Sequence, residues 1–381
     1  MNLREIAKRA NVSIATVSRT INCPPNLDPS LARRVRKVIE GVGYYPNTHA
    51  RALVSGHSRI LGLMVSETVE PFLPEILQTF EDLSFEHNYE ILLSSISRDP
   101  RRMEVAARRM IERRVEGLAV LSLEKETSLV ELLRGQNLPI AVLDHEPTGP
   151  LLKTVSIDYK HGVREAVQHL AALGHARIAL ITGPARLKTA VARTIAFQEC
   201  MKEIDLEILP QLLMEGDHTL EGGMKALSAL AASPDPPSAV LGSNDMTAIG
   251  VMRRAFELGL SVPRDLSVVG FDDNRLAQFA TPPLTTVQMS FVEIANAAFK
   301  ALLKPAEVRS HESSREVSAI QSNLVLRCST TLTTRRVRDA AVGKRAHNRA
   351  ATEREPKSES KSRSSTGLNT CAPRLNVVGQ S

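Results

Sequence analysis

Between Ile60 and about residue 270, short apolar segments alternate with longer segments whose apolar residues recur at helical spacing. The short segments are rich in branched aliphatic residues, which is typical of buried strands. Strands that alternate with helices form parallel sheets covered by helices on both faces. They are too many for one sheet, so we predict an α/β fold of two doubly wound lobes. The predicted strands are 60–65, 91–93, 117–121, 139–143, 154–157, 177–181, 239–241 and 266–270, with helices over 76–86 and 103–114.

The first 46 residues predict a different structure, a small all-α domain of three short helices. Ser13 is a good N-cap for a second helix over 14–21. Asp28 can cap a third helix, in which Pro29 takes the first helical position. Two short helices joined by a tight turn have the shape of a helix-turn-helix. The apolar positions at helical spacing, which we expect to be buried, are Leu3, Ile6, Ala7, Ala10, Val17, Ile21, Leu31, Val35, Val38 and Val42.

The outward side chains of the second helix are short and polar apart from one long cation. A helix that enters the major groove needs small residues for close approach and one or two side chains that read bases. Arg19 can bond a guanine through two hydrogen bonds, and Thr16 and Ser18 can anchor phosphates. The alternative from these residues alone is an ordinary three-helix domain with a solvated arginine.

Charge divides the chain into three parts. Residues 1–59 carry a net +7, residues 60–334 a net −8 and residues 335–381 again +7. A basic head on an acidic body predicts that only the head meets a polyanion. The other interpretation is that a small domain is basic by chance.

Two stretches in the head are more specific than its charge. The sequence V-S-I-A-T-V-S-R-T-I-N at 12–22, followed by G-Y-Y-P-N at 43–47, resembles the LacI/GalR family of bacterial repressors. The resemblance implies that Ile14 and Ala15 read bases, although the spacing of Ile14 from Val17 also fits a core position. The residues that it implies for DNA binding are Ser13, Ile14, Ala15, Thr16, Ser18, Arg19, Asn22, Tyr45, Asn47, His49, Ala50 and Leu53.

From residue 47 to Ser55-Gly56 the sequence shows no strong pattern of core residues. We therefore interpret residues 47–58 as a linker. In the resembling family this hinge folds into a helix on the operator, and a leucine wedges into a central base step of the minor groove. Leu53 matches that leucine. Unstacking costs a few kcal/mol, which the contacts of a bent duplex offset. The resemblance also implies a homodimer on a palindromic double-stranded operator.

The resemblance continues through the core to about Thr330, with S-N-D at 243–245 and S-V-V-G-F-D-D at 267–273. It implies a periplasmic-binding-protein fold with three crossovers. The expected first lobe is about 60–157 plus 287–314, and the second about 158–286 plus 315–334. We expect a small-molecule effector, a sugar or related metabolite, to bind between the lobes. We expect it to control DNA binding allosterically. The residues implied to hold it are Phe72, Asp144, Arg193, Asn244 and Asp272.

The core departs from the family pattern in two places. Ala196 stands where glycine is usual, and Glu70 stands where asparagine is usual. A carboxylate near the cleft favours a ligand with donors or positive charge. Because the chain has no tryptophan, any stacking on a sugar ring must come from Phe or Tyr. The alternative is that the polar residues at the strand ends reflect ordinary loop chemistry.

Other classes of function find little support. Residues 183–189 lack the second glycine of a phosphate-binding P-loop, and neither H-E-x-x-H nor G-x-S-x-G occurs. The four cysteines have no metal-ligand spacing, so we expect no metal site. In the absence of these catalytic motifs we also expect neither an enzyme nor a cofactor. A transport component of the same core fold is the first alternative, and an enzyme that uses the cleft is the second.

The ends of the chain and its apolar runs bear on location and assembly. The first residues mix charges, and no apolar run spans a membrane, so we expect a cytoplasmic bacterial protein associated with the nucleoid. Residues 335–381 are predicted to be a disordered basic tail without heptads, which favours a dimer over a tetramer.

Overall fold

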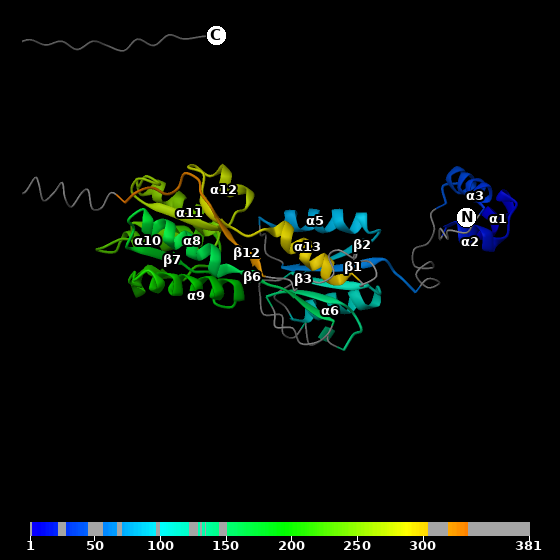
Figure 1. The fold of residues 1–381 in the computed structure, drawn as a ribbon, viewed down its shortest axis with the longest axis horizontal. Coiled ribbons are helices and arrows are strands. Elements are labelled where there is room, and N and C mark those ends of the chain that lie inside the picture. Colours follow the sequence, from blue (N-terminus) through cyan, green and yellow to red (C-terminus); the bar gives the residue numbers. More distant parts are fainter. Residues whose placement is uncertain are drawn as a thin grey trace, which may run out of the picture. The chain divides into compact units, whose positions relative to one another are not determined.

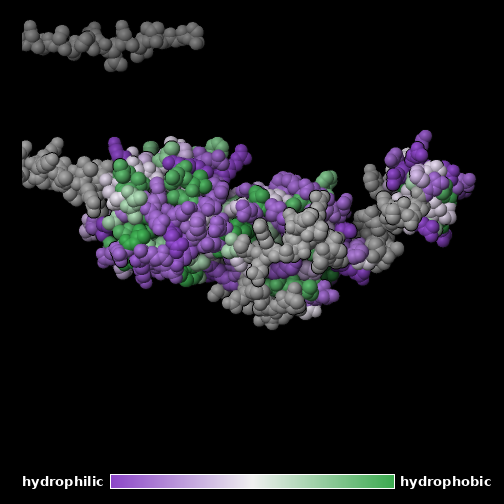
Figure 2. All heavy atoms as spheres, in the orientation of Figure 1, coloured by the Kyte–Doolittle hydropathy of each residue, from purple (hydrophilic) through white to green (hydrophobic). Residues whose placement is uncertain are grey.

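The computed structural model describes residues 2–21, 28–44, 56–66, 71–96, 100–121, 129, 132–133, 135–144, 151–303 and 319–333. No helix within these ranges is long and apolar enough to cross a membrane. The face seen in Figure 2 is mainly hydrophilic over both lobes, with hydrophobic patches of limited extent.

The head contains the three predicted helices, α1 (Leu3–Ala10), α2 (Ile14–Ile21) and α3 (Pro29–Gly41). The side chain of Asp28 accepts a hydrogen bond from the Ser30 amide and caps α3, as the sequence predicts. Five apolar side chains are buried in the described part of the head, namely Ile6, Ala7, Ala10, Val17 and Val35. The other predicted core positions are only half-buried, because three short helices cannot enclose a larger interior.

The first lobe contains a five-stranded parallel sheet in the order β2-β1-β3-β4-β5. Figure 1 shows α5 (Leu73–Glu86) and α13 (Phe291–Leu302) on one side of it and α6 (Pro100–Glu112) on the other. Two separate apolar clusters on the opposite sheet faces agree with this arrangement. The strands are β1 (Ile60–Ser66), β2 (Glu90–Ile96), β3 (Gly117–Leu121), β4 (Ile140–Leu143) and β5 (Leu152–Val155).

The second lobe contains a six-stranded sheet in the order β13-β11-β10-β9-β7-β8, parallel except for β13. Its strands are β7 (Ile178–Ile181), β8 (Leu213–Met214), β9 (Ala239–Gly242), β10 (Ser267–Asp272), β11 (Thr285–Gln288) and β13 (Asn323–Val325). Its helices are α8 (Tyr159–Ala172), α9 (Lys188–Glu203), α10 (Leu220–Ala231), α11 (Asp245–Glu257) and α12 (Arg275–Phe279), with the short η1 (Pro210–Leu212) before β8.

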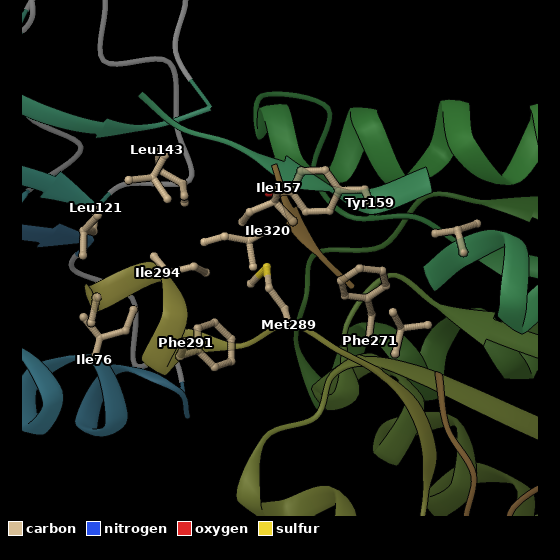
Figure 3. Packing of buried hydrophobic residues seen from close by; sticks show 14 of the residues in the cluster. Ile76, Leu121, Leu143, Ile157, Tyr159, Phe271, Met289, Phe291, Ile294 and Ile320 are labelled. Atoms are coloured by element: carbon tan, nitrogen blue, oxygen red, sulfur yellow. The ribbon is translucent and has the colours of Figure 1, made fainter. Parts of the chain in front are cut away.

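The chain passes between the lobes three times. The predicted strand 154–157 divides here into β5 and the short β6 (Ile157–Asp158), which pairs in parallel with β12 (Ile320–Gln321). The other crossing follows β11, which stays paired with β10 up to Gln288. Figure 3 shows Ile157, Ile320 and Met289 close together at these crossings. One apolar cluster continues through this region from one lobe to the other.

Candidate functional site

The first turn of α2 presents small and apolar side chains to solvent. The Ser13 hydroxyl accepts a hydrogen bond from the Thr16 amide (3.1 Å) and so caps the helix. Val17 is fully buried and anchors the helix to the head core, whereas Ile14 is 44% exposed. The structure therefore removes the ambiguity over Ile14, whose side chain lies outside the core. Ala15 beside it is also exposed.

Several further cations are exposed on the head. Arg19 is exposed, and Thr16 and Ser18 are half-buried on the same helix. The Arg34 guanidinium donates to the Asn11 carbonyl (3.4 Å) and so ties α3 to the turn before α2. Such a surface can place a narrow helix in a groove while cations meet the phosphates on either side. The exposed cations of α3 are Arg33, Arg34, Arg36 and Lys37.

Replacing Ser13 with alanine should destabilise the first turn of α2. Loss of an N-cap costs about 1 kcal/mol, which corresponds to amide exchange about five times faster. Hydrogen exchange at Thr16 and Val17 in the full chain measures this directly. Ser18→Ala, farther along the same helix, is the matched control. Equal exchange rates in both variants would show that the Ser13 cap does not hold the helix.

Half of the residues predicted to bind DNA lie outside the described part of the chain. These are Asn22, Tyr45, Asn47, His49, Ala50 and Leu53. Their roles, including the minor-groove wedge of Leu53, stay predictions. Glu70, which was predicted to lie near the cleft, and the tail 335–381 also lie outside it.

In the second lobe the most prominent charged group is the buried side chain of Arg193 on α9, which is 4% exposed. Its Nη2 donates to Asp272 Oδ1 (3.0 Å), and its Nη1 donates to the Ser243 carbonyl. The guanidinium carbon lies 3.8 Å from the centre of the Phe271 ring and 5.4 Å from that of Tyr159. Its Nε is buried without a partner among the described residues. Arg193 is thus held rigidly, with its Nε–H donor unused.

Two carboxyl groups, those of Asp272 and Asp245, lie in the region around Arg193. Asp272 ends β10 with φ 112°, and burial raises its pKa to about 6 although Arg193 opposes that shift. Asp245 is fully buried, accepts from the Thr286 hydroxyl and accepts from the Asn274 amide (2.8 Å). Burial, together with the charge of Asp272, raises the pKa of Asp245 well above its ordinary value. The cluster therefore offers both donors and acceptors, which suits hydroxyl groups.

Sequence reasoning missed His218, which lies directly beside this cluster. Its Nε2 lies 3.0 Å from the Ser243 hydroxyl. Its backbone carbonyl accepts a hydrogen bond from the side-chain Nδ2 of Asn244 (3.1 Å). The imidazole packs so closely on Gly183 that a β-carbon there would overlap it. Burial, together with the charge of Arg193, lowers the pKa of His218 to about 3, so the ring is neutral. The sequence carries no clear signal for it, because the strand before it, β8, is only two residues long.

Asp144 connects the two lobes. It follows β4 in the left-handed region with φ 47°. Its Oδ1 accepts from the Ile157 amide (3.0 Å) and its Oδ2 accepts from the Tyr159 hydroxyl (2.6 Å). Burial raises the pKa of both Asp144 and Tyr159. Asp144 was predicted to bind an effector, and the structure shows both its oxygens bonded at the first crossing. Figure 3 shows Tyr159 close to Phe271 on the second-lobe side of this region.

The two remaining predicted cleft residues lie in different surroundings. Phe72 stacks on Phe291 in the first lobe, with ring centres 4.3 Å apart. Asn244 is 2% exposed and caps α11 by accepting from the Thr247 amide (2.9 Å). The structure thus brings Arg193, Asp272 and Asn244 to adjacent strand ends of one sheet. Asp144 lies at the crossing and Phe72 on the other lobe.

Two family models match the chain. Residues 2–47 match bacterial regulatory proteins of the lacI family, and residues 167–330 match a periplasmic binding protein-like domain.

Curated relatives and solved structures match over most of their length. Catabolite control protein A of Priestia megaterium is 30% identical over 305 residues, which is 80% of this chain and 92% of that protein. The HTH-type transcriptional repressor CytR of Escherichia coli K12 is 33% identical over 79% of this chain and 88% of its own. A Lac repressor structure, bound to ONPG in the repressed state, superposes with a TM-score of 0.77 at 26% identity, covering 87% of this chain and 99% of that one.

Proposed function

The chain belongs to the lacI family of bacterial regulatory proteins, and we propose that it represses transcription by binding a palindromic DNA operator as a dimer. The observation that carries the proposal is the first turn of α2. It is capped by Ser13, anchored by buried Val17 and presents exposed Ile14 and Ala15 beside Arg19. An apolar side chain at this place can contact a thymine methyl, and Arg19 can read a guanine.

We propose four functional parts, a reading head (1–46), a hinge (47–58), an effector-binding core (59–334) and a basic tail (335–381). The hinge places Leu53 in the minor groove, as the family resemblance implies. A protein with this function acts on DNA inside the bacterial cell. The named relatives are transcription regulators rather than enzymes, which supports a regulatory use of the core.

The dimer requires a surface that two copies share. Three phenylalanines project from the core, with Phe85 on α5 84% exposed, Phe256 on α11 75% exposed and Phe279 on α12 69% exposed. Covering each of these rings by a second copy would remove apolar area from water, which is favourable by roughly 25 cal/mol per Å². We therefore propose that they lie at or near the dimer interface.

The effector binds where the second-lobe strand ends face the crossings. The unused Nε of Arg193 offers a donor, Asp272 offers an acceptor, and neutral His218 offers a polar ring. The buried rings of Phe271 and Tyr159 pack against the guanidinium and hold it in place for a ligand. This set fits a hydroxyl-rich metabolite such as a sugar. Binding changes the angle between the lobes and so the order of the two hinges, with a coupling of about 1–3 kcal/mol.

Selection from random-sequence duplexes, followed by gel-shift titration, tests the proposed function. We expect enrichment of a palindrome whose half-sites match the spacing of two heads. Enrichment of no palindrome, or binding indifferent to sequence, would contradict the proposal.

Replacing Leu53 with alanine should weaken binding to the enriched duplex and leave binding to a random duplex nearly unchanged. The wedge is expected only on the operator, whereas random DNA is held mainly by phosphate contacts. Gel-shift titration of both duplexes measures the two affinities, and Leu53→Met, which keeps an apolar wedge, is the control. An equal loss on both duplexes would count against the wedge.

A further inference from the structure

The core is acidic, yet one of its segments is strongly basic. Residues 100–114, which comprise α6 and the turn after it, contain six arginines and two glutamates. The apolar residues of α6 pack onto the first-lobe sheet, with Ala107 and Met110 almost fully buried. All six arginines are exposed. The basic face is therefore the solvent side of a well-anchored helix.

The C-terminal end of α6 lies where the hinge enters the core. The Ser58 hydroxyl donates to the Arg114 carbonyl (2.5 Å), and the Arg59 amide donates to Glu116 Oε1 (2.9 Å). His57 Nδ1 also lies 3.5 Å from Glu116 Oε1. These contacts fix the turn after α6 against the last residues of the hinge. Arg113 and Arg114 thus flank the point at which the chain leaves the core toward the head.

The arginines at this end of α6 are not used within the described protein. Arg109 lies in the last turn of α6, and Arg113, four residues later, begins the following turn with its amide bonded to the Arg109 carbonyl (3.0 Å). Like charges at this spacing repel each other. No carboxylate among the described residues forms an ion pair with Arg109, Arg113 or Arg114. By contrast, Arg108 on the same helix pairs with Glu104 (2.8 Å). The unpaired arginines gather at the hinge end of the core.

We propose that Arg109, Arg113 and Arg114 form a second DNA contact, in which the core itself meets phosphates near the operator centre. The inference rests on the proposed function, because the hinge brings DNA to this place. Exposed charges interact over about one Debye length, roughly 8–10 Å at physiological salt, and residues bonded to the end of the hinge are the part of the core best placed to come within that range. The net charge of the core predicted that only the head meets a polyanion. The proposed contact departs from that prediction.

The test is the salt dependence of binding to the duplex enriched by selection. Each phosphate contact contributes about 0.9 to the slope of log affinity against log salt. In a dimer, Arg109→Gln with Arg113→Gln removes four arginines and should make the slope shallower by up to about 3.6. Arg109→Lys with Arg113→Lys keeps the charges and should keep the wild-type slope. Arg101→Gln with Arg102→Gln makes the same charge change at the other end of α6 and is the matched control.

The outcomes separate this inference from the proposed function. A shallower slope in the Arg109/Arg113 glutamine variant alone supports the contact. Equal slopes in wild type and both glutamine variants overturn it and indicate instead an acidic partner or a purely structural role. If the wild-type chain selects and binds no palindrome, the proposed function fails as well. Circular dichroism melting of each variant checks that the exposed substitutions leave the fold intact.

Discussion

Replacing Arg193 with methionine should lower the free energy of unfolding by about 3–5 kcal/mol at neutral pH. The substitution keeps an unbranched side chain but removes the partner of the buried Asp272 carboxylate and the cation between two aromatic rings. An uncompensated buried charge is costly. Denaturant unfolding followed by fluorescence or circular dichroism measures the difference, and the variant should also lose its response to effector.

The same substitution should change the pH dependence in a defined direction. Burial raises the pKa of Asp272 and Arg193 lowers it, so loss of Arg193 raises that pKa further above about 6. A carboxyl group whose folded pKa is raised is destabilising when ionised. The stability lost in Arg193→Met should therefore be larger at pH 8 than at pH 5.

Addition of Asp272→Asn to Arg193→Met should restore most of the lost stability, because it removes the unpaired charge. Arg164→Met, which removes one partner of an exposed pair with Glu203 (3.0 Å), is the control and should change little. A fall of less than about 1 kcal/mol in Arg193→Met would contradict the account of the buried pair. So would the absence of any rescue by Asp272→Asn.

Replacing His218 with glutamine should flatten the acid side of the stability profile. The folded pKa of His218 is about 3, against an ordinary value of 6.5, so the unfolded chain binds a proton that the folded protein does not. The stability that His218 contributes is present above pH 6.5 and is lost as pH falls toward 3. The slope in that window is at most about 1.4 kcal/mol per pH unit.

The comparison isolates His218 from other groups. Asp245 and Asp272, whose raised pKa values act in the opposite direction, are common to both proteins. Residue 218 has φ 66°, a conformation that strains glutamine as it strains histidine. Any difference in strain moves the whole curve of stability against pH up or down without changing its slope. His169→Gln, which replaces a histidine of less lowered pKa away from the cluster, is the control. Parallel curves for wild type and His218→Gln would show that the folded protein protonates this ring.

The sequence predicted the parts of the fold that bury long apolar runs. The strands β1, β3, β4 and β9 are aliphatic and fall where the pattern placed them. The strands that it missed are short or polar. For example, β11 reads Thr-Thr-Val-Gln and gains its place by pairing with β10 rather than by its own pattern. Such strands are set by tertiary contacts that a local pattern does not contain.

The candidate site was predictable where a motif marks it and not where distant segments meet. Arg193 and Asp272 followed from the family resemblance, and the structure pairs them. The contact of Asp144 with Tyr159 depends on the approach of the second lobe, which no spacing in the sequence indicates. His218 lies after a two-residue strand that the pattern did not reveal. The contact of Ser58 with Arg114 joins residues far apart in the chain.

The central claim is that one molecule couples two sites, a DNA-reading head and a ligand cleft in the core. The most direct measurement is reciprocal linkage with the selected palindrome and one ligand. That ligand is whichever sugar, sugar phosphate, nucleobase or amine most raises the melting temperature. At 100 times its Kd a ligand stabilises the folded protein by about 2.7 kcal/mol. The account predicts that the ligand changes operator affinity about 5–150-fold and that the operator changes ligand affinity by the same factor. Equal operator affinity with and without saturating ligand would contradict it.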